Sequence, residues 1–224
     1  MFRKLYSALT SESSVDLAFK ELTKMLEHGA WMFERANEAL HSTQSADEMR
    51  EPLYERDRQI NELERSIRRK VLRYLTVHPG HDVAICLALM SVAKDAERIG
   101  DYCKNVFEVG HFYREGFNVP KYQQPLDHIS TQTAAMFSLV IAGVRDSNEA
   151  QARKALASSK EIRSQCDQLI KELFRDEDKV AFHEAVAYSL LARHFKRVAA
   201  HLAHVASAAL GQLEELDLHS SDEE

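Results

Sequence analysis

Apolar residues recur at alternating steps of four and three along most of this 224-residue chain. Such spacing returns apolar side chains to one face of an α-helix, because the helix completes a turn about every 3.6 residues. The first run of this kind is made of Val15, Phe19, Leu22, Leu26, Gly29, Phe33, Ala36 and Leu40. Similar runs lie at residues 45–77, 82–106, 126–144, 150–174 and 180–213. The pattern predicts an all-α protein of six long antiparallel helices.

A glycine and two prolines interrupt the pattern in the segment from Gly116 to Pro125. Because proline disfavours a helical conformation in the residue before it, this segment predicts a helix end and a linker. Three helices precede the linker and three follow it. The apolar positions of residues 97–106 (ERIGDYCKNV) repeat at residues 196–205 (KRVAAHLAHV). We therefore predict two tandem three-helix bundles, at residues 1–117 and 118–215, related by duplication.

The composition narrows the class of protein. The chain has 29 Lys and Arg against 35 Asp and Glu, a net charge of −6, so we expect no nucleic-acid partner. Its three cysteines are isolated and odd in number, which favours a reducing compartment over a disulfide framework. There is no signal peptide and no run of roughly 20 apolar residues, so we expect a cytoplasmic protein that reaches a membrane only through partners. Residues 216–224 are acidic and predict a flexible tail.

Glu97 and Asp101 lie one turn apart on the third predicted helix. Two carboxylates at this spacing repel each other unless a cation lies between them. Gly100 stands between the two, and a glycine inside a helix costs about 1 kcal/mol relative to alanine. We therefore expect a neighbouring helix or a ligand to approach closely at Gly100.

The second predicted helix carries a matching polar stripe, because Asp57, Asn61 and Glu64 follow one another at steps of four and three. If the two helices pack antiparallel through their apolar faces, the stripe comes near Glu97, Asp101 and Asn105. Their carboxylate and amide oxygens suit a hard cation such as magnesium, manganese, calcium or iron. The alternative is a solvated acidic strip that is balanced by basic neighbours, namely Arg58, Arg65, Arg98 and Lys104.

Residues 93–108, with their DAERIGD core, resemble the diagnostic segment of the PhoU family of phosphate-uptake regulators, and residues 57–67 resemble the matching segment of the preceding helix. The resemblance implies two three-helix bundles and cytosolic control of inorganic phosphate transport. Implied partners are a phosphate transporter and a sensor histidine kinase, and we expect a homodimer. Carboxylate motifs of that family bind multinuclear metal clusters. The resemblance thus implies a divalent or trivalent ion (iron, zinc, manganese or magnesium) at Asp57, Glu97 and Asp101, with Asn61 replacing an aspartate.

The second half departs from the family pattern. Lys196 and Ala200 stand where the resemblance implies carboxylates, and Arg163 corresponds to Asp57. Asp167 is the acidic residue that remains. We therefore do not expect a second metal cluster of the same kind. Lys196 or Arg163 could neutralise acidic groups of a partner, but we favour the interpretation that they are solvent-facing replacements.

Two further patterns leave alternatives open. His194, His201 and His204 share a broad face of the last predicted helix, where they could bind a transition metal, sense pH or line a partly exposed groove. Two Glu-x-x-His pairs, Glu38 with His41 and Glu108 with His111, match the pattern of di-iron bundles. Both pairs lie at helix ends, where histidine also complements the negative pole of the helix. A ferritin-like metalloprotein and a purely structural homodimeric bundle are thus the alternatives.

Motifs of catalysis are missing from the sequence. The chain has no glycine-rich phosphate loop, no Gly-x-Ser-x-Gly elbow and no His-Glu-x-x-His pair. We therefore predict that the protein is not an enzyme.

Overall fold

The computed structural model describes residues 14–41, 43–175 and 180–212, with side chains other than those of residues 41–46. Six helices lie in these ranges: α2 (Ser14–His41), α3 (Thr43–Val77), α4 (Val83–Phe112), α5 (Pro120–Arg145), α6 (Glu149–Arg175) and α7 (Phe182–Ala209). The all-α prediction is confirmed. The predicted tail at residues 216–224 lies outside the described residues. None of the described helices combines the length and apolar character that crossing a membrane requires.

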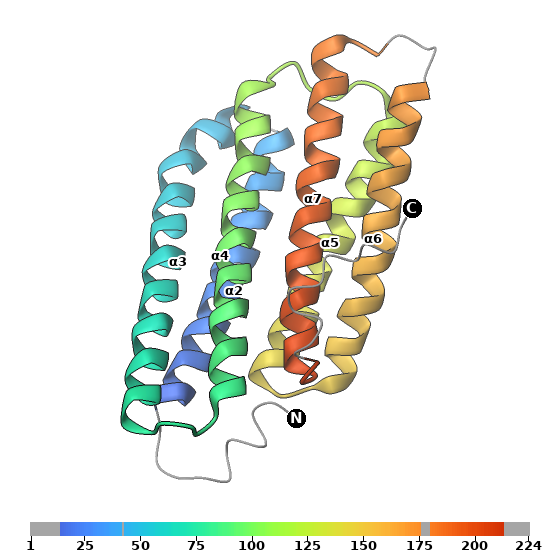
Figure 1. Ribbon diagram of the computed structural model, residues 1–224. Coiled ribbons are helices and arrows are strands. Elements are labelled where there is room, and N and C mark those ends of the chain that lie inside the picture. Colours follow the sequence, from blue (N-terminus) through green and yellow to red (C-terminus); the bar gives the residue numbers. More distant parts are fainter. Residues whose placement is uncertain (1–13, 42, 176–179, 213–224) are drawn as a thin grey trace.

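The helices form two sets of three. Helices α2, α3 and α4 pack against one another, as do α5, α6 and α7. Contacts of α4 with α7, and of α2 with α5, join the sets, and Figure 1 shows α4 and α7 side by side along most of their length. Phe33 of α2 packs against Phe137 of α5 and Phe195 of α7, with ring centroids 5.6 and 5.4 Å apart. The two sets therefore share one continuous core.

The connection between the two sets is shorter than the sequence indicates. Helix α5 begins at Pro120 rather than near Leu126, so the non-helical segment is only residues 113–119. Proline suits the first position of a helix, since its missing N–H has no helical partner there and its φ angle is already helical. Pro125 lies within the first two turns of α5 and does not end the helix.

Gly100 is the point of close approach between α3 and α4. A Cβ atom added there would lie 3.0 Å from Cδ1 of Ile60, which is tighter than ordinary van der Waals contact. The expected close approach is confirmed, and a neighbouring helix makes it. The same Cβ would lie 3.8 Å from Oδ1 of Asp57, so this crossing also brings the polar stripe of α3 beside α4.

Candidate metal centres

Asp57 of α3 and Asp101 of α4 are brought together around a lysine. The Nζ atom of Lys104 lies 3.0 Å from Oδ2 of Asp57 and 3.4 Å from Oδ1 of Asp101. Burial lowers the pKa of Lys104, but the hydrogen bonds and negative charges of the two aspartates outweigh burial and hold that pKa above its usual value. Lys104 therefore stays protonated and supplies the positive charge that neighbouring carboxylates require.

The other predicted metal ligands contact side chains or backbone of their own helices. Glu97 accepts a hydrogen bond from Lys94 at 2.7 Å, and Glu64 pairs with Arg68 at 2.8 Å. Asn61 donates to the backbone carbonyl of Asp57 at 3.0 Å. Within the described ranges, no three of the predicted acidic ligands bring their oxygens within 4.8 Å of one another. An ion at this place would have to displace Lys104.

Asn105 faces a groove of about 640 Å³ between the last turns of α4 and the first turns of α7. Glu108 and His194 also line it. Two aromatic side chains that line the groove are exposed to solvent: Phe112 is 80% and Phe182 is 76% exposed. Asn105 thus stands beside an apolar groove.

The equivalent place in the second set of helices also carries a lysine, but it reaches the carboxylate differently. The Nζ atom of Lys196 on α7 donates to Oδ1 of Asp167 on α6 at 2.6 Å. The side chain of Lys196 is 28% exposed, so it faces solvent in part while its ammonium pairs with Asp167. Ala200, one turn further along α7, has no charge to add.

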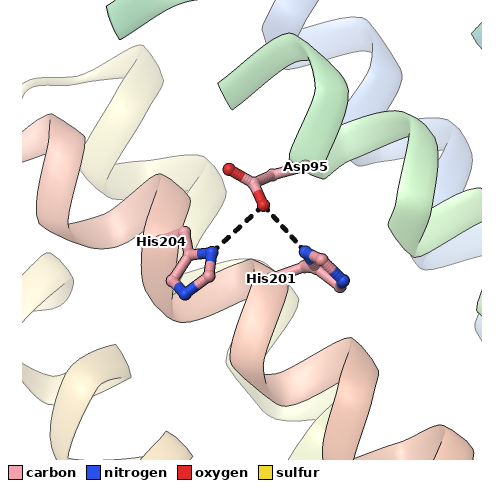
Figure 2. Close-up of side chains that lie close together, drawn as sticks. All are labelled: Asp95, His201 and His204. Carbon is pink, nitrogen blue, oxygen red and sulfur yellow. Dashed lines mark hydrogen bonds and ion pairs between the residues drawn. The ribbon is translucent and has the colours of Figure 1, made fainter. Parts of the chain in front are cut away.

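The structure also brings together an aspartate and two histidines that the sequence does not connect (Figure 2). Oδ1 of Asp95 on α4 lies 2.7 Å from Nδ1 of His201 and 3.1 Å from Nδ1 of His204. The two histidines stand three residues apart on α7 and therefore share a face. One ligand atom from each of the three residues lies within 4.8 Å of the other two. The cluster spans the boundary between the two sets of helices.

Asp95 and His201 are buried, each 8% exposed. Burial raises the pKa of Asp95, but hydrogen bonds from His201 and His204, and the charge of those histidines, hold it below its usual value, so the carboxylate is ionised. The ring of Tyr102 stacks on His201 with centroids 5.6 Å apart, and Arg197 donates to the Tyr102 hydroxyl at 3.1 Å. The His201 imidazole is thus held in place on α7 by a residue of α4.

The sequence pattern indicates His201 and His204 as candidate ligands but not Asp95. Asp95 is 106 residues from His201, and only the packing of α4 on α7 makes them neighbours. A signal was present, however: Asp95 stands between Ala93 and Ala96, both core positions, where a charged residue needs a partner. His194, the third histidine of the predicted face, is not part of the cluster.

The di-iron alternative finds no support in the described contacts. Glu38 pairs with Arg35 at 2.7 Å, and Glu108 accepts a hydrogen bond from Tyr54 at 2.6 Å. Within the part of the chain that the structure describes, neither glutamate forms a metal-ligand group with His111. The side chain of His41 lies outside the described residues.

The profile of the PhoU domain matches residues 22–109 and again residues 126–209. The chain belongs to the PhoU family. The two matches fall on the two sets of three helices and confirm the resemblance to PhoU. The prediction that the protein is not an enzyme agrees with this family match.

Individual PhoU proteins are also similar to this chain in sequence or in structure. The chain is 33% identical over 78 residues to the phosphate-specific transport system accessory protein PhoU homologue of Caulobacter vibrioides, in each of two strains. That alignment covers 35% of this chain and 34% of the relative, so the chain matches about a third of its length. The crystal structure of PhoU from Pseudomonas aeruginosa has a TM-score of 0.78 at 21% identity and covers 90% of this chain and 97% of that one.

A second solved structure shows the same fold. The phosphate transport system regulatory protein PhoU of Streptococcus pneumoniae has a TM-score of 0.70 at 21% identity. The similarity covers 93% of this chain and 99% of that one. The architecture described above is therefore the PhoU-like fold.

Proposed function

We propose that this PhoU-family protein is a cytoplasmic adaptor that regulates inorganic phosphate transport and phosphate-responsive signalling. Its partners in this proposal are a phosphate transporter and a sensor histidine kinase. The observation that carries the proposal is the match of the PhoU domain to both halves of the chain. The name of the Caulobacter relative, an accessory protein of a phosphate-specific transport system, supports the same role.

The fold suits an adaptor. All six described helices pack their apolar faces into the shared core, so recognition of a partner falls to the outer faces of long helices. A homodimer would double such a surface, and light scattering of the purified protein tests that prediction.

Deletion of the gene in its host tests the proposed role. We expect phosphate uptake to lose its dependence on external phosphate, and we expect the tagged full-length chain to capture transporter and kinase subunits after cross-linking. A complementing copy of the gene is the control and should restore both the uptake response and the capture. Unchanged regulation of uptake in the deletion strain would reject the proposal.

The ion implied by the family resemblance stays a separate proposal. The carboxylates of Asp57, Glu97 and Asp101 are suitable ligands for iron, zinc, manganese or magnesium. Lys104 competes for two of them, at 3.0 and 3.4 Å. A divalent ion brings more charge than an ammonium, so binding there requires the Lys104 side chain to move away.

Thermal melts with and without EDTA test this ion in the wild type and in a Glu97→Ala, Asp101→Ala variant. If an ion stabilises the first set of helices, EDTA lowers the melting temperature of the wild type by more than that of the variant. Equal melting temperatures for the wild type with and without EDTA would reject a structural ion at these carboxylates.

A further inference from the structure

We propose that Asp95, His201 and His204 form a binding site for a borderline transition-metal ion of the zinc class, which links the two sets of helices. The proposal does not depend on the role in phosphate transport. It also differs from the carboxylate site at Asp57 in place and in ligand chemistry.

The geometry is close to that of a metal site. Two imidazole nitrogens already point at one carboxylate oxygen, at 2.7 and 3.1 Å (Figure 2). Zinc binds nitrogen and carboxylate oxygen at about 2.0–2.2 Å, which in a tetrahedral arrangement separates neighbouring ligand atoms by roughly 3.3 Å. Making room for the ion therefore means opening the Asp95–His201 pair by about 0.6 Å and the Asp95–His204 pair by about 0.2 Å.

The donor set selects the class of ion. Imidazole favours zinc, copper, iron and nickel, whereas magnesium and calcium favour oxygen. Two histidines and one carboxylate leave a coordination position for water or for a group from a partner. The cluster therefore predicts zinc-class selectivity, which the all-oxygen set around Asp57 does not.

The surroundings resemble a prepared site with access to solvent. Asp95 and His201 have side chains that are 11% and 10% exposed, while the side chain of His204 is 30% exposed and gives an ion a way in. Tyr102 orders the His201 ring from one face. Nε2 of His201 is buried without a hydrogen-bond partner in the described structure, so the polar contact of this ring is made through Nδ1, toward Asp95.

An ion here would act across the boundary between the two sets. Asp95 is on α4 and both histidines are on α7, the pair of helices that joins the first set to the second. A bound ion would fix these two helices relative to each other and stabilise the folded chain in proportion to its occupancy.

The test uses the full-length protein, stripped with EDTA and dialysed against Zn²⁺ or Co²⁺. We expect one tightly bound ion per chain at this site, and a visible Co²⁺ spectrum that is typical of nitrogen coordination. His204→Asn should weaken binding about 100-fold or more, since even the loss of an outer-shell partner costs 10–100-fold. His128→Asn, which changes an exposed histidine of α5, is the matched control and should bind normally.

A second comparison separates this site from the carboxylates of the first set. Glu97→Ala with Asp101→Ala should keep the ion, whereas Asp95→Asn should lose it. A Co²⁺ spectrum of the wild type without nitrogen ligation, or unchanged affinity in His204→Asn, would overturn the proposal and leave a plain Asp–His–His hydrogen-bond cluster. If Asp95→Asn does not fold, the wild-type spectrum and His204→Asn still decide, because His204 is partly exposed.

Discussion

In each of the two sets of helices, a lysine ammonium pairs with a carboxylate where two helices cross, but the two lysines stand at different positions of the repeated unit. In the first set, Lys104 of α4 reaches Asp57 and Asp101; in the second, Lys196 of α7 reaches Asp167. In the alignment of residues 97–106 with 196–205, Lys104 corresponds to Ala203, and Lys196 corresponds to Glu97. The duplicated unit has thus kept its apolar positions, while its charged positions differ between the two copies. Both helix crossings thus contain a lysine ammonium beside a carboxylate, although no single position of the repeated unit supplies it.

The histidines of the cluster also stand at positions where the two copies of the unit differ. In that alignment His201 and His204 correspond to Tyr102 and Asn105 of the first half. One copy of the unit therefore offers imidazoles where the other offers a phenol and an amide. Only the second copy can present two nitrogen ligands to the carboxylate of Asp95, so the proposed metal site arises from the divergence of the copies.

The largest expected effect tests whether the two sets are energetically one unit. Phe33→Ala removes a fully buried ring that touches helices of both sets, which should lower the free energy of unfolding by about 3–5 kcal/mol. Urea denaturation should still show one transition, because the core is shared. Phe174→Ala, at a position that is 87% exposed, is the control and should change stability by less than about 0.5 kcal/mol. Two separate transitions in the wild type would show that the sets are independent.

The next effect concerns His28, which lies beside cations, whereas His201 and His204 lie beside the carboxylate of Asp95. Burial, then the charges of Arg56 and Lys24, lowers the pKa of His28 from 6.5 to about 4. The folded protein therefore keeps His28 neutral where the unfolded chain is already protonated. This costs nothing above pH 6.5, and as the pH falls from 6.5 toward about 4 it removes up to about 3 kcal/mol of stability.

Urea denaturation between about pH 7 and pH 4.5 measures that loss. His28→Gln cannot take up a proton, and its amide oxygen can still accept a hydrogen bond from Arg56. We expect the variant to lose less stability than the wild type over this range. Parallel stability curves for the two proteins would contradict the prediction.

A smaller effect sharpens the comparison of the two lysines. Lys104→Met leaves two carboxylates without their shared ammonium, one of them largely buried, and should cost about 1–3 kcal/mol. Lys196→Met breaks a pair whose side chains are 28% and 33% exposed, and should cost less than about 1 kcal/mol. Added Mn²⁺ should restore stability to the first variant alone. Equal losses in the two variants, measured by urea denaturation, would show that the two crossings do not differ.

Much of the fold follows from the sequence because helical periodicity is a local signal. The four-three spacing locates the helices, and Gly100 correctly predicts the approach of a neighbouring helix. The predicted start of helix α5, near Leu126, is wrong because Pro120 can begin a helix as well as end one. The resemblance of residues 57–67 and 93–108 to PhoU was sufficient to name the family, which the domain matches confirm.

The candidate sites were harder to predict because they depend on contacts between distant segments. The sequence includes Lys104 among the basic neighbours of the acidic strip, yet nothing in the spacing says that its ammonium lies between Asp57 and Asp101. Asp95 was missed for the same reason, since its partners on α7 are revealed only when the two sets are packed together. Whether an ion binds Asp57, Glu97 and Asp101 stays a prediction.

The contacts of Phe33 with Phe137 and Phe195 predict how fragments of this chain would behave. A fragment that ends before Pro120 would present this ring, and its neighbours in α2 and α4, to water instead of to α5 and α7. Either half produced alone is therefore expected to self-associate or aggregate. A chain that contains both sets of helices does not expose this surface, because each set covers the other.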